Sequence, residues 1–321
     1  MDTVLELLVR EVAKPRPKNC TFETCSVKQS VYGYLPNRPV TIVLVVLFGI
    51  SMIAHIFQGV KSRSWTFVVA LGIGCFGEAV DVKVFAGLVF AMKTWALTVF
   101  PSLGIQLVCL TVSPAFIAGG IYLTLKHVII IYGSKFSRIA PRLYTWIFVS
   151  CDILSILIQT SGAVIASRGT GKVSTGNNVM MLGLVLQVVT LLIFGAMTID
   201  VYLRIRKFSG QHNAANHELI HSKRFKWLLI SILVSYIAIL LRCIYRIAEM
   251  AGGWANPIMQ DEVSFVVLDG FLCWVAVVVL NVFHPGFLFK ESYETVKSEK
   301  DARSETVTEA PAEDVPVVAK A

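Results

Sequence analysis

The chain has 321 residues, of which 55% are hydrophobic and 16% charged, and its mean hydropathy is +0.68. A soluble domain of this length carries more charge, whereas several runs here reach the roughly 20 apolar residues that a helix needs to cross about 30 Å of hydrocarbon. The composition excludes an ordinary soluble protein and predicts an all-α, polytopic membrane protein. The net charge of +8 is typical of the cytoplasmic loops of such proteins and does not indicate a nucleic-acid partner.

The first 38 residues form a polar tail that we expect to be extracellular or luminal. The tail contains the triplet "NCT", which makes Asn19 an N-glycosylation acceptor. Cys20 and Cys25 could close a small disulfide if the tail faces an oxidising compartment. No histidine cluster or second cysteine pair accompanies them, so no metal site is expected.

Seven apolar segments predict a seven-helix transmembrane domain over residues 39–286. The third contains Pro114, which should kink it. Residues 287–321 are rich in Glu, Lys, Ser, Thr and Pro and predict a disordered cytoplasmic tail. The expected spans are residues 39–60, 65–88, 103–131, 145–167, 179–203, 227–250 and 263–283.

The distribution of Lys and Arg among the loops predicts the orientation. The loops after the first, third and fifth expected spans are basic, whereas the loop after the sixth has no basic residue. Basic loops stay cytoplasmic, which places the N-terminus outside and the C-terminus inside. Six basic residues in the N-terminal tail argue against this assignment, but most lie far from the first span, where their effect fades.

The sixth expected span carries Arg242, Arg246 and Glu249 on one helical face. An Arg at the centre of an inserting helix costs roughly 2.5–3.5 kcal/mol, so these side chains need either an escape to the surface or partners inside the bundle. One interpretation is a pair of arginines that extend outward, with a local ion pair between Arg246 and Glu249. The other is a buried outer cluster in which acidic groups of other spans join the arginines.

The candidate partners divide into an outer and an inner group. Glu78, Asp269 and Glu262 are expected near the arginines. Asp152 should lie on the cytoplasmic side, with the basic loops or with Asn281 and His284. The two groups could line a cavity for a lipid with a polar head, or they could clamp helices together. The full set of candidate cavity residues is Glu78, Asp81, Asp152, Gln159, Arg242, Arg246, Glu249, Glu262, Asp269, Asn281 and His284.

A series of motifs in a fixed order extends this interpretation. Between Tyr32 and Gly286 the chain reads "YGYLPNRP", "AHIFQG", "GCFGE", "SPAFIAGGIYLTL", "FVSCDILSILIQTSG", "RCIYRIAE" and "LNVFHPG". In this order they resemble the fungal lipid-translocating exporter family, also called RTA1-like proteins. The resemblance implies a seven-span protein of the plasma membrane or an internal membrane, linked to sphingoid bases or to resistance against toxic amphiphiles. One departure is "EAVDVKVF", where Asp81 and Lys83 replace a Gly-Tyr and Arg pattern of the family.

The sequence favours a translocator or exporter of an amphiphile, such as a sphingoid base or a toxic compound, giving lipid transport or resistance. The alternative is a seven-helix lipid sensor without transport activity. The chain has no phosphate-binding loop of the G-x-x-x-x-G-K-[ST] form, and its histidines lack metal-binding spacing, so we expect neither an enzyme nor a cofactor. The expected partners are a membrane lipid or amphiphilic small molecule and cytoplasmic regulators of the C-terminal tail.

Overall fold

The computed structural model describes residues 37–90, 99–133, 137–138, 140–167, 173–207, 220, 222–253, 256–258 and 260–286. The glycosylation site at Asn19, the cysteine pair Cys20 and Cys25, and the C-terminal tail lie outside these residues. The side chain of Asp81 also lies outside the described part, although its backbone belongs to a helix.

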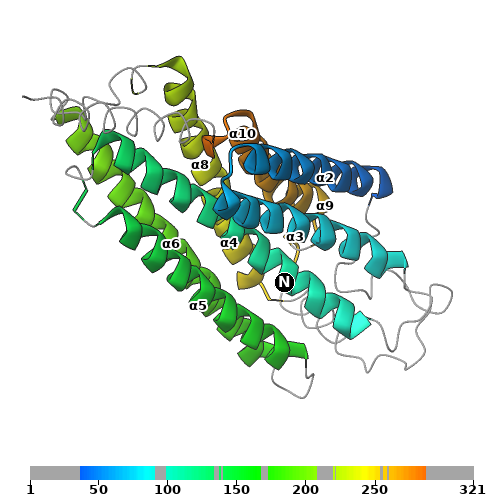
Figure 1. Ribbon diagram of the computed structural model, residues 1–321. Coiled ribbons are helices and arrows are strands. Elements are labelled where there is room, and N and C mark those ends of the chain that lie inside the picture. The colour runs from blue at the N-terminus through cyan, green and yellow to red at the C-terminus, as the bar shows by residue number, and fades with distance from the viewer. Residues whose placement is uncertain are drawn as a thin grey trace, which may run out of the picture.

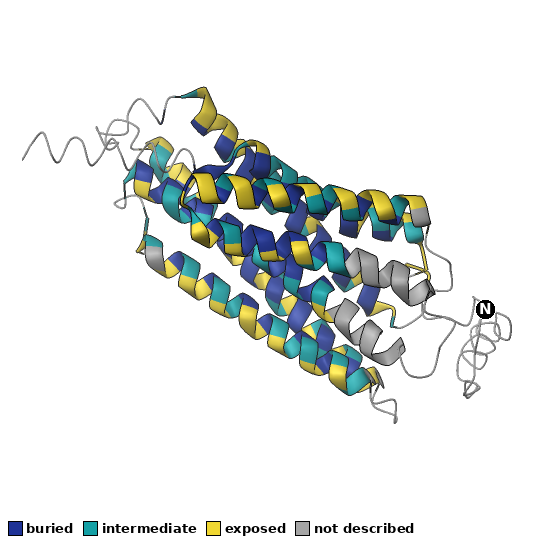
Figure 2. Ribbon diagram, turned by 45° about the vertical axis from the view of Figure 1, so that its right-hand side comes forward, coloured by how far each residue is buried: buried dark blue, intermediate teal, exposed yellow. Residues whose placement is uncertain are grey.

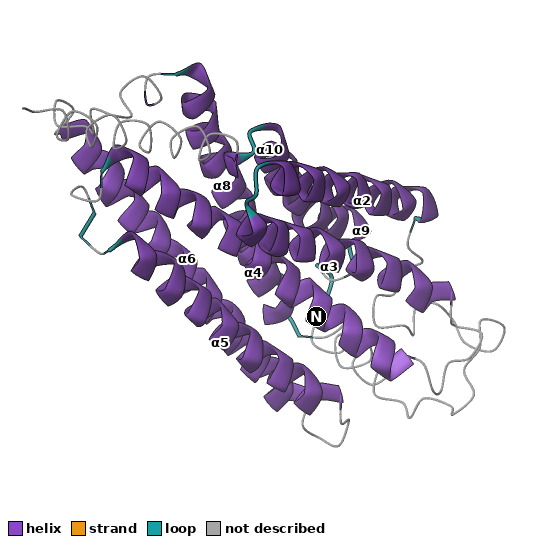
Figure 3. Cartoon of the chain, in the orientation of Figure 1, coloured by secondary structure: helices purple, strands orange, loops and turns teal. Residues whose placement is uncertain are grey.

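Every regular element in the described residues is a helix (Figure 3). A helix covers each of the seven apolar segments that the sequence singles out. The last segment is divided into an α-helical turn, a π-helical turn and a longer α-helix. The elements are α2 (Arg38–Lys61), α3 (Trp65–Phe90), α4 (Val99–Tyr132), α5 (Pro141–Ser167), α6 (Val173–Lys207), α8 (Lys223–Ala251), α9 (Glu262–Phe265), η5 (Val266–Phe271) and α10 (Leu272–Val282).

Six stretches of the described chain are long and apolar enough to cross a membrane, namely those in α2, α4, α5, α6 and α8 and the combined last helix Glu262–Val282. In α3 the qualifying stretch is shorter, Trp65–Val80. The all-helical membrane fold is therefore established. A seventh crossing by α3 and the outward N-terminus stay predictions.

The helices lie side by side in one elongated bundle (Figure 1). α5 packs on α6, α3 on α2 and α4, and α10 on α8. α4 contacts α3, α5, α6, α8 and α10 and occupies the centre, because 72% of its most apolar window is buried, against 28% for the windows of α2 and α5.

The outer surface of the bundle is apolar, as expected for helices in contact with lipid. Buried residues face inward and exposed residues outward along each helix (Figure 2). The exposed residues include Ile53, Phe57, Trp146 and Leu157, each at least 60% exposed. A surface this apolar is unfavourable in water and stable in hydrocarbon.

The last helix begins at a capped end. The Asp261 carboxylate accepts hydrogen bonds from the Val263 backbone nitrogen and the Ser264 hydroxyl. The bond from Ser264 is the main reason that the pKa of Asp261 is lowered. A lowered pKa means that this cap stabilises the fold above the ordinary pKa of an aspartate and is lost as the pH falls through the folded value.

Candidate functional site

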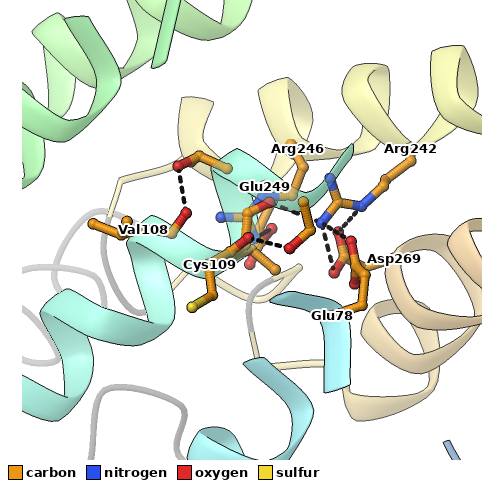
Figure 4. A network of polar contacts seen from close by, with 10 residues as sticks. Glu78, Val108, Cys109, Arg242, Arg246, Glu249 and Asp269 are labelled. Atoms are coloured by element: carbon orange, nitrogen blue, oxygen red, sulfur yellow. Dashed lines mark hydrogen bonds and ion pairs between the residues drawn. The ribbon is translucent and has the colours of Figure 1, made fainter. Parts of the chain in front are cut away.

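Arg242 lies at the centre of a charge cluster built by three helices. Its side chain on α8 is 2% exposed, and its Nε atom lies 2.9 Å from Oδ1 of Asp269 on η5. Its Nη2 atom donates to Oδ2 of Asp269 at 3.4 Å and lies 3.5 Å from Oε1 of Glu78 on α3. Figure 4 shows the two carboxylates converging on one guanidinium. Because a lone buried charge in a bilayer is costly, this pairing explains how α8 can hold an arginine at this depth.

A proline on α4 supplies the remaining acceptor of the cluster. In an α-helix the nitrogen of residue 114 would bond to the carbonyl of residue 110, but Pro114 has no N–H. The Leu110 carbonyl is thereby left free, and Nη2 of Arg242 donates to it at 2.9 Å. Pro114 thus joins α4 to α8, in keeping with the rule that backbone groups freed in a membrane helix find other partners.

Asp269 reaches the cluster from the π-helical turn η5. A π-turn adds a residue to the helical repeat, so it changes the direction in which side chains leave the helix, and such turns are frequent at functional sites. Asp269 and Gly270 are the buried residues of this turn. The sequence predicted a helix here but gave no sign of the irregularity.

Arg246 and Glu249 extend the cluster along α8. They form a buried ion pair one helical turn apart, and the Glu249 carbonyl accepts a hydrogen bond from Asn256 at 3.1 Å. Arg246 is only 6% exposed, so neither arginine extends to the surface. The interpretation in which both arginines extend outward is therefore wrong, although the ion pair between Arg246 and Glu249 that it included is present. Among the described side chains, the cluster comprises three carboxylates (Glu78, Glu249 and Asp269) and two guanidiniums (Arg242 and Arg246). Fully ionised, these five side chains carry one excess negative charge.

Glu262 does not join the arginines, in contrast to our expectation. It is the first residue of α9, and its Oε1 atom accepts a hydrogen bond from the backbone nitrogen of Asn37 at 2.5 Å. Asn37 is the N-cap of α2. Glu262 therefore ties the start of the last helix to the start of α2, and its position in the first turn of its own helix is the electrostatically favoured one for an acid.

The residues expected at the inner end do not form one cluster. Asn281 donates to the Ser51 carbonyl at 3.2 Å, and Nδ1 of His284 accepts from the Gly286 nitrogen at 3.1 Å. The His284 ring lies 5.9 Å from that of His55, a residue that the sequence analysis did not place in a cavity. These residues join α2 to the last helix. Among the described residues, no group of three His, Cys, Asp or Glu side chains is arranged to hold a metal ion.

Asp152 lies elsewhere, near the middle of α5, and forms none of the expected contacts with Asn281, His284 or the basic loops. It is 3% exposed, and neither of its carboxylate oxygens has a hydrogen-bond partner in the described part of the protein. The Tyr122 hydroxyl of α4 lies close to it, outside hydrogen-bond geometry. Further along α5, the side-chain nitrogen of Gln159 donates to Oε1 of Gln187 on α6 at 3.1 Å.

Replacing Pro114 by alanine should weaken the bond between α4 and Arg242. The new N–H competes with Arg242 for the Leu110 carbonyl, a hydrogen bond worth about 1–2 kcal/mol. Removing a proline from the helix interior also favours α4 by about 3 kcal/mol, so the two effects are separated by making Pro114→Ala in the wild type and in Arg242→Ala. We expect the melting temperature in detergent to rise more in the Arg242→Ala background, where there is no bond to lose. Equal shifts in both backgrounds would contradict the role assigned to the proline.

An apolar helical bundle with a charge cluster sealed inside it defines a multi-pass integral membrane protein. The chain matches the model of the family described as RTA1 like protein over residues 72–292. It therefore belongs to the RTA1-like family, the fungal family that its motifs resemble.

Curated relatives support this assignment over most of the chain. The chain is 29% identical to the sphingoid long-chain base transporter RSB1 of Saccharomyces cerevisiae, over 84% of this chain and 77% of that protein. It is 28% identical to the protein RTA1 of the same yeast, over 85% and 90% of the two chains. It is 23% identical to the probable lipid transporter atnI of Emericella nidulans, over 80% and 68%. No solved structure matches the chain.

Proposed function

We propose that this protein transports an amphiphilic lipid across the membrane, and that its substrates are long-chain bases or compounds of similar shape and charge. The observation that carries the proposal is the excess carboxylate of the buried cluster formed by Glu78, Arg242, Arg246, Glu249 and Asp269. The similarity to proteins named as a sphingoid long-chain base transporter and a probable lipid transporter points in the same direction.

The excess charge allows the cluster to bind a cation or a proton in addition to holding helices together. An unbalanced carboxylate inside the hydrocarbon must be neutralised by a proton or by a cation. The amine of a long-chain base supplies such a cation, and a proton supplies the neutral state when the amine has left. The cluster would then bind amine and proton in alternation, which couples lipid movement to a proton gradient.

The arrangement of the helix ends supports an inward C-terminus. Arg138, between α4 and α5, pairs with Asp200 of α6 at 3.1 Å. The ring of Phe67, in the first turn of α3, lies near the rings of His127 on α4 and His284 after the last helix, with centroid distances of 5.9 and 6.1 Å. The basic loops and the end of the last helix thus share one end of the bundle. We propose that this end is cytoplasmic, in a plasma membrane or an internal membrane, and that the opposite end carries the glycosylated tail.

A lipid-movement assay tests the proposal. Purified protein is placed in liposomes that carry a fluorescent sphingoid base in one leaflet, with and without a proton gradient. We expect protein-dependent movement that a gradient accelerates, and slower movement of an N-acylated analogue, which lacks the cationic amine. Saturable binding without movement would favour the lipid sensor instead. A protein that neither binds nor moves the base would contradict both functions.

A further inference from the structure

An apolar groove runs along the surface of the bundle between α3, α4 and α5. It encloses about 430 Å³, within the range of small-molecule sites, and its lining is almost wholly apolar. α3 contributes Trp65 and Val69, α4 contributes Phe116 and Leu123, and α5 contributes Ile153. The groove is separate from the charge cluster, since it contains none of the cluster residues.

The groove opens toward lipid. Trp65, Val69 and Ile153 are 63%, 54% and 53% exposed on the outer surface of the bundle. Gly119 on α4 also lines it, and a side-chain carbon at that position would meet no atom within 4 Å. The missing side chain deepens the groove, which is open on the side of the bundle that faces lipid.

Two residues of the lining carry polar groups that lie buried behind the apolar surface. The hydroxyl of Thr145 and both carboxylate oxygens of Asp152 are buried and have no hydrogen-bond partner among the described residues. No described basic side chain forms an ion pair with Asp152. An unpaired buried carboxylate is costly and in membrane proteins marks a pathway for substrates or protons. Its charge is complementary to an amine.

We propose that this groove is the lateral entry site for a long-chain amine, which lies with its alkyl chain between α3, α4 and α5 and pairs its amine with Asp152. The groove follows α5 from Thr145 to Ile156, about 17 Å of helix. It begins at the end of the bundle that carries the turn between α2 and α3. Asp152 lies nine residues inside the span Leu143–Ala166, roughly 14 Å from its start.

This position assigns Asp152 a step in the route of the headgroup. A base that leaves the leaflet beside the basic loops would pass Thr145 first and reach Asp152 near the middle of the bilayer. The cluster around Arg242 would then take part in the second half of the crossing. The order of these steps rests on the proposed function. Binding of the amine in the groove can be measured independently of transport.

Labelling with a photoreactive lipid tests the groove directly. The full chain in lipid nanodiscs is labelled with a sphingoid base that carries a diazirine in its alkyl chain, and the labelled peptides are mapped by mass spectrometry. We expect labels on the groove residues of α3, α4 and α5. A control probe has the same alkyl chain and diazirine but an alcohol in place of the amine. It should label the groove at least about tenfold less at equal concentration, because it cannot form an ion pair with Asp152.

Two matched pairs of variants sharpen the test. Ile153→Trp fills the groove, whereas Leu154→Trp places the same ring on the neighbouring residue, which is 52% exposed but does not line the groove. We expect the first to reduce labelling about tenfold and the second to change it by less than about twofold. Asp152→Asn should weaken labelling by the amine about tenfold and leave labelling by the alcohol unchanged. Asp200→Asn, which removes a carboxylate outside the groove, should affect neither.

The outcomes separate the groove from the transport function. Labels that map elsewhere, or equal labelling of Ile153→Trp and Leu154→Trp, would overturn the groove even if the wild type moves lipid. Labelling as expected, together with no lipid movement by the wild type, would support the groove and refute transport. If Asp152→Asn fails to fold, the Ile153 and Leu154 pair and the alcohol probe still decide.

Discussion

Arg242→Ala is expected to abolish lipid movement and to destabilise the protein more than any other single charge removal in the cluster. The substitution leaves the carboxylates of Glu78 and Asp269 and the freed Leu110 carbonyl without their shared donor. Removing one partner of a buried ion pair costs about 3–5 kcal/mol. The melting temperature in detergent and the rate of sphingoid-base movement in liposomes measure the two effects.

Two further substitutions serve as controls for charge and geometry. Arg206→Ala removes an exposed arginine at the end of α6 and should leave both measurements close to the wild type. Arg242→Lys keeps the charge but cannot approach both oxygens of Asp269 at once, so we expect an intermediate loss. Wild-type melting and transport by Arg242→Ala would show that the cluster contributes to neither.

A triple replacement separates the structural contribution of the cluster from its proposed function. A buried ion network can often be exchanged for apolar side chains of similar volume without loss of stability. Combining Arg242→Met, Glu78→Leu and Asp269→Leu should therefore recover much of the stability that Arg242→Ala loses. If the cluster lies on the route of the lipid, movement should stay absent in this stable protein; recovered movement would mean that the charges only hold the helices together.

The second large effect is expected at the contact between α5 and α6, from Gly162→Ala. A methyl group on Gly162 would lie 2.6 Å from the backbone nitrogen of Met180 and 2.8 Å from the Gly176 carbonyl. Backbone atoms cannot turn aside as a flexible side chain can, so the two helices must separate. Overpacking of this kind costs typically about 1–3 kcal/mol, which we expect to appear as a lower melting temperature and a lower yield of folded protein.

Gly49→Ala on α2 is the matched control. A methyl group there would meet nothing within 4 Å, and alanine favours a helix over glycine by about 1 kcal/mol. The control should therefore melt at or above the wild-type temperature. If Gly162→Ala did the same, the close approach of α5 and α6 would not require glycine.

The membrane class, the helical segments and the family could be predicted from the sequence. Apolar segment length, the charges of the loops and the order of the motifs are properties of the chain itself, so they need no knowledge of packing. The sequence also predicted the grouping of Arg242 with Glu78 and Asp269, because a charge in hydrocarbon must be paired and few partners lie at the right depth. The Leu110 carbonyl was missed, although a proline inside a helix always frees the carbonyl four residues earlier.

What only the tertiary structure decided is which helices meet and in which direction each side chain leaves its helix. Glu262 and Asp152 were both assigned partners from their depth in the membrane, and both face other neighbours, because depth constrains one coordinate and rotation about the helix axis is set by packing. The groove beside Asp152 is formed by residues of three separate helices, so no single segment of the sequence encodes it. The π-turn at Asp269 was likewise seen only in the structure. The composition of the chain thus determined that it lies in a membrane. The rotation and packing of the helices determined its charged contacts and its lipid-facing groove.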